Sequence, residues 1–467
     1  MIRPIKIFLY FFLTILLIVL IDRVMNNLNI ILIPEWGTLL PTMVDTTSLP
    51  TAVLPSEIIE GDDSLSVSQD SINEKTISFP VDSDIIFIND SALIAPEQFR
   101  RLFAQFCRKA AESTKQKTVL RVLHIGDSQI EADRITETLR KKFQESYGGS
   151  GPGFIMPYDP LRINANIQLI NEGEWQLSYS YHKNNYPGPL SFGFSAKAAW
   201  YWGSSASFSV SPLAWKSNRL GHFSKAKLFV ATRGDSLTVQ IRNNSATLSR
   251  DTLPPYKAIQ TITVENLPTE EKITFEFISK HTPVFHGLTL DGESGVAVDN
   301  LAMRGRPWPG MRLAKHELLK SMADELNIGL FILQFGTNIL PTRSDDYHYY
   351  YTHFIKELKI LRDLFPEIPI LVIGVQSAAT SIDNEVKPLQ RARLISNAQR
   401  SAALECGMGF IDLQRAMGGI NAAVTWANQE PPLITSDYIH FSRKGAKKIG
   451  TMIWELIETL RIQINEQ

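Results

Sequence analysis

Two separated stretches of the chain show the alternation of β-strand and helix that builds a parallel sheet. Residues 119–125 form a β-branched, mostly apolar run that predicts a strand, and apolar residues at helical spacing follow it as far as Gly148. The same alternation returns after residue 300 and continues to residue 460. Because such alternation gives parallel strands with helices on both faces, the sequence predicts an α/β domain whose first strand and helix are separated from the others.

The second stretch predicts four helices and three strands in turn. The expected helices cover residues 313–326, 354–364, 394–406 and 444–460, and the expected strands cover residues 329–335, 370–375 and 410–413. Ahead of the first strand, Phe99, Leu102, Phe103 and Phe106 mark one face of a helix that begins near Pro96. Folded structure is therefore expected from about residue 91 onward.

Residues 161–290 have a different texture and predict an inserted domain. Short alternating segments recur there, separated by turn residues, at residues 227–231, 236–241, 259–264 and 273–278. This pattern is typical of an antiparallel β-sandwich. The insertion would divide the α/β domain into a first part, residues 91–160, and a second part, residues 291–467.

The N-terminus predicts a membrane anchor followed by a tether. Arg3 and Lys6 precede an apolar run over residues 7–21, and no small-residue cleavage site follows. We interpret residues 1–34 as an uncleaved signal anchor with one transmembrane helix, and a cleaved signal peptide is the alternative. Residues 35–90 are rich in Thr, Ser, Pro and acidic residues and are expected to be a disordered linker. The folded part would then face the periplasm or the cell exterior.

Overall composition narrows the classes of partner. The 467 residues carry a formal net charge of -1, so there is no electrostatic reason to expect nucleic acid as a partner. The two cysteines, Cys107 and Cys406, lie far apart in sequence and are expected to be buried free thiols, because they form neither a disulfide framework nor a CxxC metal site. The oligomeric state has no signature in the sequence.

Three short polar motifs stand next to predicted strands or helices. Gly-Asp-Ser-Gln at residues 126–129 follows the first strand, Gly-Thr-Asn at residues 336–338 follows the strand over residues 329–335, and Asp-Tyr-Ile-His at residues 437–440 precedes the last helix. Open α/β sheets place their sites at the carboxyl ends of their strands. The three motifs are therefore expected to meet at one edge of the sheet.

Each motif has a catalytic and a structural interpretation. Ser128 on a tight turn could act as a nucleophile, or it could cap the helix that follows. Asn338 could donate to an oxyanion, or it could satisfy the backbone of a loop. Asp437 could orient His440 toward the serine, whereas the alternative is a solvated histidine in a loop. The order and placement of all three motifs favour the catalytic interpretation, with Ser128 as nucleophile, His440 as base and Asp437 as its partner.

These motifs resemble blocks I, III and V of the SGNH, or GDSL-like, hydrolase superfamily. The run Val-Leu-His-Ile-Gly-Asp-Ser-Gln-Ile-Glu-Ala-Asp at residues 122–133 is similar to the first block of bacterial peptidoglycan O-acetylesterases, which carry a carbohydrate-binding-module-like β-sandwich between blocks I and II. Residues 295–305 look like block II. The resemblance spans roughly residues 95–460 and implies a flavodoxin-like, three-layer SGNH fold with an inserted sandwich.

The resemblance also implies an activity and an oxyanion hole. It points to a carboxylic ester hydrolase that removes O-acetyl groups from an envelope polysaccharide, with peptidoglycan as the implied glycan and no metal or organic cofactor. The oxyanion would be held by the Ser128 and Gly305 N–H groups and the Asn338 side chain. Gln129 departs from the histidine usual in the subgroup, and Ile339 stands where an acidic residue is common.

Two other functions remain open at the level of sequence. An O-acetyltransferase would use the same triad, and a glycan-binding scaffold would carry a vestigial catalytic domain. Aromatic residues Trp200, Tyr201 and Trp202 are candidate sugar contacts in the insert. The alternative places them in the core of the sandwich, because aromatic residues are favoured in strands.

Overall fold

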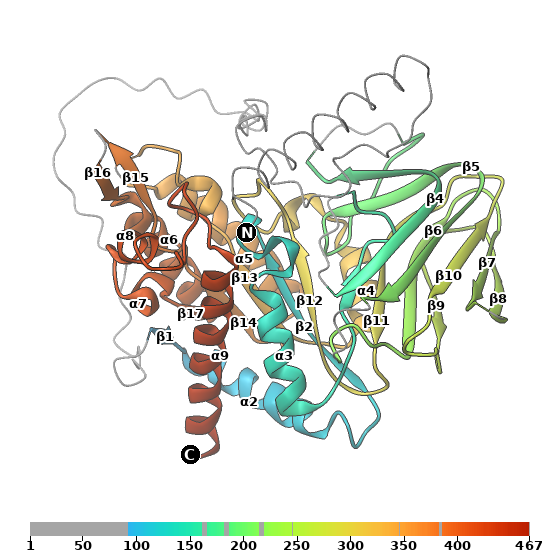
Figure 1. Cartoon of the computed structure of the whole chain (residues 1–467), viewed down its shortest axis with the longest axis horizontal. Coiled ribbons are helices and arrows are strands. Elements are labelled where there is room, and N and C mark those ends of the chain that lie inside the picture. The colour runs from blue at the N-terminus through green and yellow to red at the C-terminus, as the bar shows by residue number, and fades with distance from the viewer. Residues whose placement is uncertain are drawn as a thin grey trace, which may run out of the picture. The chain divides into compact units, whose positions relative to one another are not determined.

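The computed structural model describes the chain from residue 92 to residue 466, apart from six short interruptions (Figure 1). The described ranges are residues 92–160, 166–181, 186–213, 219–244, 246–344, 346–382 and 385–466. The expected anchor at residues 1–34 and linker at residues 35–90 lie outside them. None of the helices in the described ranges is long and apolar enough to cross a membrane.

A six-stranded sheet forms the centre of the α/β part. Its spatial order is β1 (Leu93–Ile94), β17 (Gly409–Ile411), β14 (Ile370–Ile373), β13 (Ile328–Gln334), β2 (Val119–Gly126) and β12 (Gly295–Ala302). All neighbours are parallel except β1, which is antiparallel to β17. Counting the parallel strands along the chain gives the order 2-1-3-4-5, the flavodoxin-like order. In such sheets, ligands bind at the carboxyl ends of strands where the order reverses, here beside β2.

Both faces of this sheet are buried by helices. The long helices are α2 (Glu97–Glu112), α3 (Thr136–Tyr147), α4 (His316–Leu326), α5 (His348–Leu364), α6 (Arg391–Glu405) and α9 (Arg443–Asn465), with short α7 (Leu413–Met417) and α8 (Ala422–Ala427). On β2, Val122 packs in a cluster with residues of α2, α3 and α9, whereas Leu123 packs in a second cluster with residues of α4, α5 and α6. Successive side chains of a strand point to opposite faces, so the mostly apolar run in β2 follows from burial on both sides.

The chain between α3 and β12 forms antiparallel strands. They are β3 (Gly153–Ile155), β4 (Ile167–Tyr179), β5 (Lys197–Pro212), β6 (Lys225–Thr232), β7 (Leu237–Arg242), β8 (Thr247–Leu253), β9 (Tyr256–Val264), β10 (Ile273–Ile278) and β11 (Val284–Asp291). Their order is β8-β7-β10-β5-β11-β6-β9, with β4 beside β5 and β3 beside β11. These strands lie together on the green and yellow side of the fold in Figure 1.

A bend in the long strands β4 and β5 closes this sheet around an aromatic core. The first half of β5 pairs with β11 and its second half with β10. Gly203 in β5 and Gly173 in β4 have φ values of 92° and 97° where the register shifts, a backbone conformation that glycine adopts readily. As a result, Phe277 of β10 meets Phe285 of β11 at a ring-centroid distance of 4.7 Å. The sheet therefore faces itself, as in a β-sandwich.

A buried ionic group joins the sandwich to the central sheet. Arg121 of β2 contacts Asp291 at the end of β11 at 2.6 Å and Asp299 of β12 at 2.8 Å. The three side chains are at most 5% exposed. Asp299 also accepts a hydrogen bond from the backbone N–H of Phe154 in β3, at 2.9 Å. These bonds fix the two ends of the insert against β2 and the edge strand β12.

Both cysteines are buried free thiols, as predicted. Burial raises the pKa of Cys107 to about 12 and that of Cys406 to about 11. Each side chain therefore stays protonated near neutral pH and packs as a small apolar group.

Candidate active site

The nucleophile turn begins where β2 ends, at Gly126. A Cβ at Gly126 would come within 2.7 Å of the Gln334 carbonyl oxygen on β13, so this position needs glycine. Ser128 follows and opens the short helix η3 (Ser128–Asp133). Asp127 precedes that helix as its N-cap, and its Oδ1 accepts the Gln129 N–H at 3.0 Å. The capping role considered for Ser128 therefore belongs to Asp127, and the Ser128 hydroxyl is left for another contact.

Asp127 also joins the nucleophile turn to the second motif. Its Oδ2 accepts the backbone N–H of Thr337 at 3.0 Å, in the short helix η5 (Thr337–Ile339) that follows β13. Burial raises the pKa of Asp127, and the hydrogen bonds from Gln129 and Thr337 oppose that shift. This buried carboxyl group thus positions Asn338 next to the turn that carries Ser128.

Ser128, His440 and Asp437 form a hydrogen-bonded relay although they are far apart in sequence. The Ser128 Oγ lies 2.9 Å from His440 Nε2. The other ring nitrogen, Nδ1, lies 2.6 Å from Asp437 Oδ2. The His440 and Asp437 side chains are 32% and 47% exposed, so the relay opens to solvent. This is the geometry in which a carboxylate orients an imidazole that can accept the serine proton.

Asp437 stays ionised because many donors surround it. Its Oδ1 accepts from Thr435 Oγ1 at 2.7 Å and from the backbone N–H groups of Ile439 and His440 at 2.9 and 3.0 Å. Burial would raise the pKa of Asp437, but the hydrogen bonds from His440, Thr435 and the two backbone groups hold it well below its usual range. A charged carboxylate at this position stabilises a protonated imidazole.

Three further side chains position the histidine loop, which we define as residues 435–441. The Gln129 side chain donates to the Ile439 carbonyl at 3.0 Å and accepts the Phe441 N–H at 3.4 Å, so it contacts the backbone on both sides of His440. Gln376 donates to the same Ile439 carbonyl at 3.3 Å. Arg134 donates to the backbone carbonyls of Ser128 and, at 3.4 Å, Phe441.

The roles of these three residues have no local signature in the sequence. Gln129 stands out only as a departure from the resembled subgroup, and Arg134 comes directly after the block over residues 122–133. Gln376 follows β14 and has no motif around it. A polar side chain just after a parallel strand, as at Gln376, is the one general signal that could have drawn attention to it.

The two other predicted oxyanion donors lie next to one another. Asn338 Nδ2 donates to the Arg306 carbonyl at 2.9 Å, which places it beside the loop that holds Gly305, and a second hydrogen remains on the same nitrogen. The Met303 N–H, two residues earlier, donates to the Gly126 carbonyl at 2.7 Å and brings that loop to the nucleophile turn. Gly305 is exposed and has a φ of 77°, and apart from its chain neighbours no described residue has a heavy atom within 4 Å of where a Cβ would stand. A substrate could therefore approach its backbone.

The structure corrects the interpretation of Trp200 and Tyr201 as sugar contacts. The two residues are 1% and 0% exposed. Tyr201 packs edge-on against Trp175 in the sandwich core, and Trp200 packs edge-on against Tyr186 in a smaller cluster on the other side of β5. Neither ring has a free face for a sugar because β5 is covered on both sides here. Trp202 is partly exposed.

The 2-1-3-4-5 parallel sheet, the serine after its first strand and the Asp-x-x-His pair before its last helix are the features that the resemblance to SGNH hydrolases predicts. A solved structure described as a peptidoglycan O-acetylesterase in action shares this fold with a TM-score of 0.64. It is 20% identical, and the alignment covers 81% of this chain and 100% of that one. At this identity the likeness establishes the fold.

Other solved structures align more loosely. A putative GDSL-like lipase from Bacteroides ovatus is 15% identical over 63% of this chain and 98% of its own length, with a TM-score of 0.25. A family two carbohydrate esterase from Clostridium thermocellum, in complex with cellohexaose, is 9% identical over 62% of this chain and 98% of its own, with a TM-score of 0.24. Neither adds to the fold assignment. No protein-family model and no curated protein matches the sequence.

Proposed function

We propose that this chain is a serine esterase that removes O-acetyl groups from a cell-envelope polysaccharide, with peptidoglycan as the substrate. The observation that carries the proposal is the relay from Ser128 Oγ through His440 to Asp437, with distances of 2.9 and 2.6 Å. A serine hydroxyl is a weak nucleophile until an adjacent base accepts its proton. His440 is that base. The ionised Asp437 accepts a hydrogen bond from Nδ1–H of the ring, which leaves Nε2 facing the serine.

The reaction proceeds through an acetyl-enzyme. Ser128 Oγ attacks the acetyl carbonyl carbon as its proton passes to His440 Nε2, and the carbonyl oxygen becomes an oxyanion. When the tetrahedral intermediate collapses, His440 gives that proton to the departing sugar oxygen, and the acetyl group stays on Ser128. Water then loses a proton to His440, attacks the acetyl-serine and releases acetate, and the proton returns to Ser128.

Three donors stabilise the oxyanion in this proposal. They are the backbone N–H groups of Ser128 and Gly305 and the remaining amide hydrogen of Asn338. This assignment is supported by the hydrogen bonds that join the nucleophile turn, η5 and the Gly305 loop. Removing one such donor typically slows an enzyme about 10²–10³-fold.

The choice of substrate rests on the fold and on the first block. A solved structure that shares the fold is described as a peptidoglycan O-acetylesterase, and residues 122–133 resemble the first block of such enzymes. Together they favour acetylated peptidoglycan over other acyl esters. The chemistry of the relay alone requires only an ester.

The decisive experiment measures free acetate and acetylated acceptor after the full-length protein is incubated with O-acetylated peptidoglycan. We expect stoichiometric acetate from the wild type and a loss of about four orders of magnitude or more in Ser128→Ala. The exposed serine of β5 in Ser205→Ala provides a matched control that should retain activity. Equal acetate release by Ser128→Ala would refute the mechanism, and acetylated acceptor in place of acetate would identify a transferase.

The same proposal places the enzyme outside the cytoplasm, anchored by residues 1–34. Its support is the basic and apolar N-terminal sequence and the location of peptidoglycan. A C-terminal fusion to a reporter that is active only after export should be active and should sediment with membranes. An inactive fusion present at normal levels would exclude this topology.

A further inference from the structure

The side chain of Arg306, the residue after Gly305, is buried between the insert and the α/β part. Only 5% of Arg306 is exposed. Its guanidinium carbon lies 4.9 Å from the ring centroid of Tyr181, just after β4, which is a cation–π contact. Its Nη1 donates to Ser180 Oγ at 3.4 Å. Gly310 also lies against the guanidinium, because a Cβ there would stand 1.7 Å from Nη2.

The backbone of Arg306 sets the place of two proposed oxyanion donors. Its carbonyl accepts from Asn338 Nδ2 at 2.9 Å, and its N–H donates to the Met303 carbonyl at 3.2 Å, which closes the Gly305 loop into a turn. Gly305 directly precedes Arg306, so the Gly305 N–H moves with this turn. Arg306 therefore links both donors to the residues that hold its own side chain.

A second contact from the insert reaches the same loop. The Tyr181 hydroxyl donates to the Arg304 carbonyl at 3.0 Å, so Tyr181 contacts the loop through its hydroxyl and the guanidinium through its ring face. Tyr181 also packs against Tyr179 of β4, with ring centroids 5.6 Å apart. The Gly305 loop is therefore attached to a long strand of the insert.

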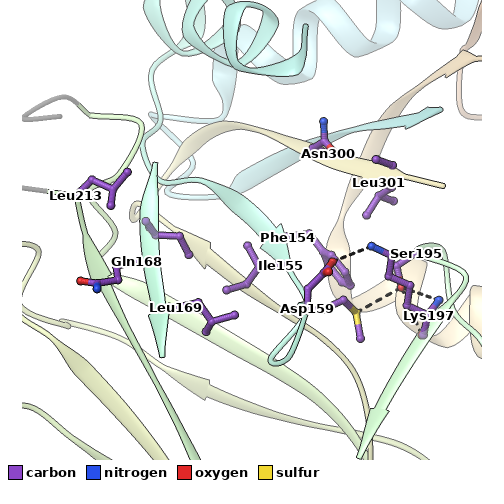
Figure 2. A pocket seen from close by; sticks show the side chains of 13 residues that line it. Phe154, Ile155, Asp159, Gln168, Leu169, Ser195, Lys197, Leu213, Asn300 and Leu301 are labelled. Atoms are coloured by element: carbon purple, nitrogen blue, oxygen red, sulfur yellow. Dashed lines mark hydrogen bonds and ion pairs between the residues drawn. The ribbon is translucent and has the colours of Figure 1, made fainter. Parts of the chain in front are cut away.

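The insert and the end of β12 pack less closely beside this attachment. A cavity of about 320 Å³ lies there, lined by Leu301 and Ala302 of β12 and, among others, by the Lys197–Asp159 ion pair (Figure 2). Atoms that face an open space have no packing contact across it. The contacts of Tyr181 are therefore important for the position of the loop that follows β12.

Stability alone does not explain the buried guanidinium. Its Nε and Nη2 are buried and have no hydrogen-bond partner among the described residues. Burial lowers the pKa of Arg306, although the negative charge of Glu357 opposes this shift. A buried donor without a partner is unfavourable for folding, so its presence calls for another reason.

We propose that Arg306 is a positioning residue of the oxyanion hole, through which the insert fixes the Gly305 N–H and the Asn338 amide relative to Ser128. The insert then contributes to the turnover of every ester, including one too small to touch it. A substrate-binding insert, in contrast, would affect only substrates large enough to reach it. The inference rests on the proposed esterase function.

Kinetics of the full-length protein on a small acetyl ester test the proposal. Arg306→Met removes the charge and keeps an unbranched apolar side chain, whereas Arg306→Lys keeps a cation beside the Tyr181 ring. Arg312→Met makes the same change at an exposed arginine of η4 (Met311–Leu313) and is the matched control. Tyr181→Phe keeps the ring and removes only the bond to the Arg304 carbonyl.

We expect Arg306→Met to lower kcat about 10²-fold with little change in KM, because displaced oxyanion donors act in the transition state and not in substrate binding. Arg306→Lys should retain more activity than Arg306→Met, and Arg312→Met should behave as the wild type. Tyr181→Phe should lower kcat about fivefold, as expected for one neutral hydrogen bond. Thermal unfolding checks that each variant is folded, and Tyr181→Phe decides the matter if Arg306→Met does not fold.

A double-mutant cycle with Asn338→Ala separates positioning from a general structural effect. If Arg306 acts through the oxyanion donors, Arg306→Met should lower kcat much less in the Asn338→Ala background than in the wild type, because one of the groups that it positions is already missing. Losses that simply multiply, or an unchanged kcat in the folded variants, would overturn the proposal. Failure of the wild type to hydrolyse the small ester would instead refute the esterase function itself.

Discussion

Gln129 connects the nucleophile turn with the histidine loop through both ends of its side-chain amide. Its donor contacts the residue before His440 and its acceptor contacts the residue after it. The relay distance of 2.9 Å therefore depends on a side chain that never touches the substrate in the proposed mechanism. Gln129 is a positioning residue, and small displacements of a reacting group can slow catalysis about 10²-fold.

Replacing Gln129 with Leu should lower kcat for a small acetyl ester about tenfold or more, because the histidine loop loses two contacts while the oxyanion donors remain. KM should change little, since no substrate contact is lost. Gln116→Leu is a suitable control, because that exposed glutamine bonds to Glu112 on the surface. Steady-state kinetics with thermal unfolding would decide the matter, and an unchanged kcat would show that Gln376 and Arg134 position the loop without Gln129.

Among single residues, the sequence predicts the reacting groups but not the side chains that hold them in position. Motifs name Ser128, Asp437 and His440 because the chemistry restricts residue type and order. The bond from Gln129 to Ile439 joins positions 310 apart, and no local pattern encodes it. For Trp200 and Tyr201 the sequence left sugar contact and core packing both open, and the structure shows core packing, because both faces of β5 are covered there.

Helices and strands with regular periodicity were predicted well from the sequence, whereas strands that bend were not. Strand β13, expected over residues 329–335, covers Ile328–Gln334, and strand β10 matches the expected residues 273–278. Helix α5 was expected from residue 354 but begins at His348. Its first turns were missed because they consist of aromatic and polar residues with weak helix preference. Strands β4 and β5 were not anticipated, since each contains a glycine in a left-handed conformation that interrupts the alternation.

The ionic contact between β2, β11 and β12 leads to a prediction about stability. Arg121→Met should lower the free energy of unfolding by about 3–5 kcal/mol, because it leaves two buried carboxylates without their partner. Arg242→Met should cost less than about 1 kcal/mol, because the Arg242 and Glu276 side chains are 47% and 35% exposed. Denaturant unfolding of both variants measures the difference. Similar losses would mean that the buried group contributes no more than a surface pair.

For the whole molecule, two buried histidines make stability depend on pH. Burial lowers the pKa of His124 to about 3, and burial with the charge of Arg233 lowers that of His286 to about 4. In the unfolded chain a histidine titrates near 6.5, so the unfolded state takes up protons first as the pH falls. The stability that the two neutral, buried histidines contribute is therefore complete above about pH 6.5. It is lost progressively as the pH falls further, by up to about 1.4 kcal/mol per pH unit for each histidine.

His286→Met tests this dependence without touching the relay. Between about pH 6 and pH 4.5 the free energy of unfolding of the variant should fall less steeply with pH than that of the wild type. The difference in slope should correspond to about one proton fewer taken up on unfolding. The substitution puts an apolar side chain in place of the imidazole, whose Nδ1 has no hydrogen-bond partner among the described residues. Free energies of unfolding measured across this range give the two slopes, and identical slopes would exclude His286 as a source of the acid sensitivity.

The relay between Ser128 and His440 joins residues 312 positions apart, and the contact of Arg121 with Asp291 spans 170. At equilibrium such distances cost little, because the entropy of closing a loop grows only about 0.6 kcal/mol with each doubling of its length. Folding rates are affected much more, since they fall as contacting residues lie farther apart along the chain. The proposed esterase activity should therefore be the last property to return on refolding, so a nascent or partly folded chain would carry a serine with no base to activate it.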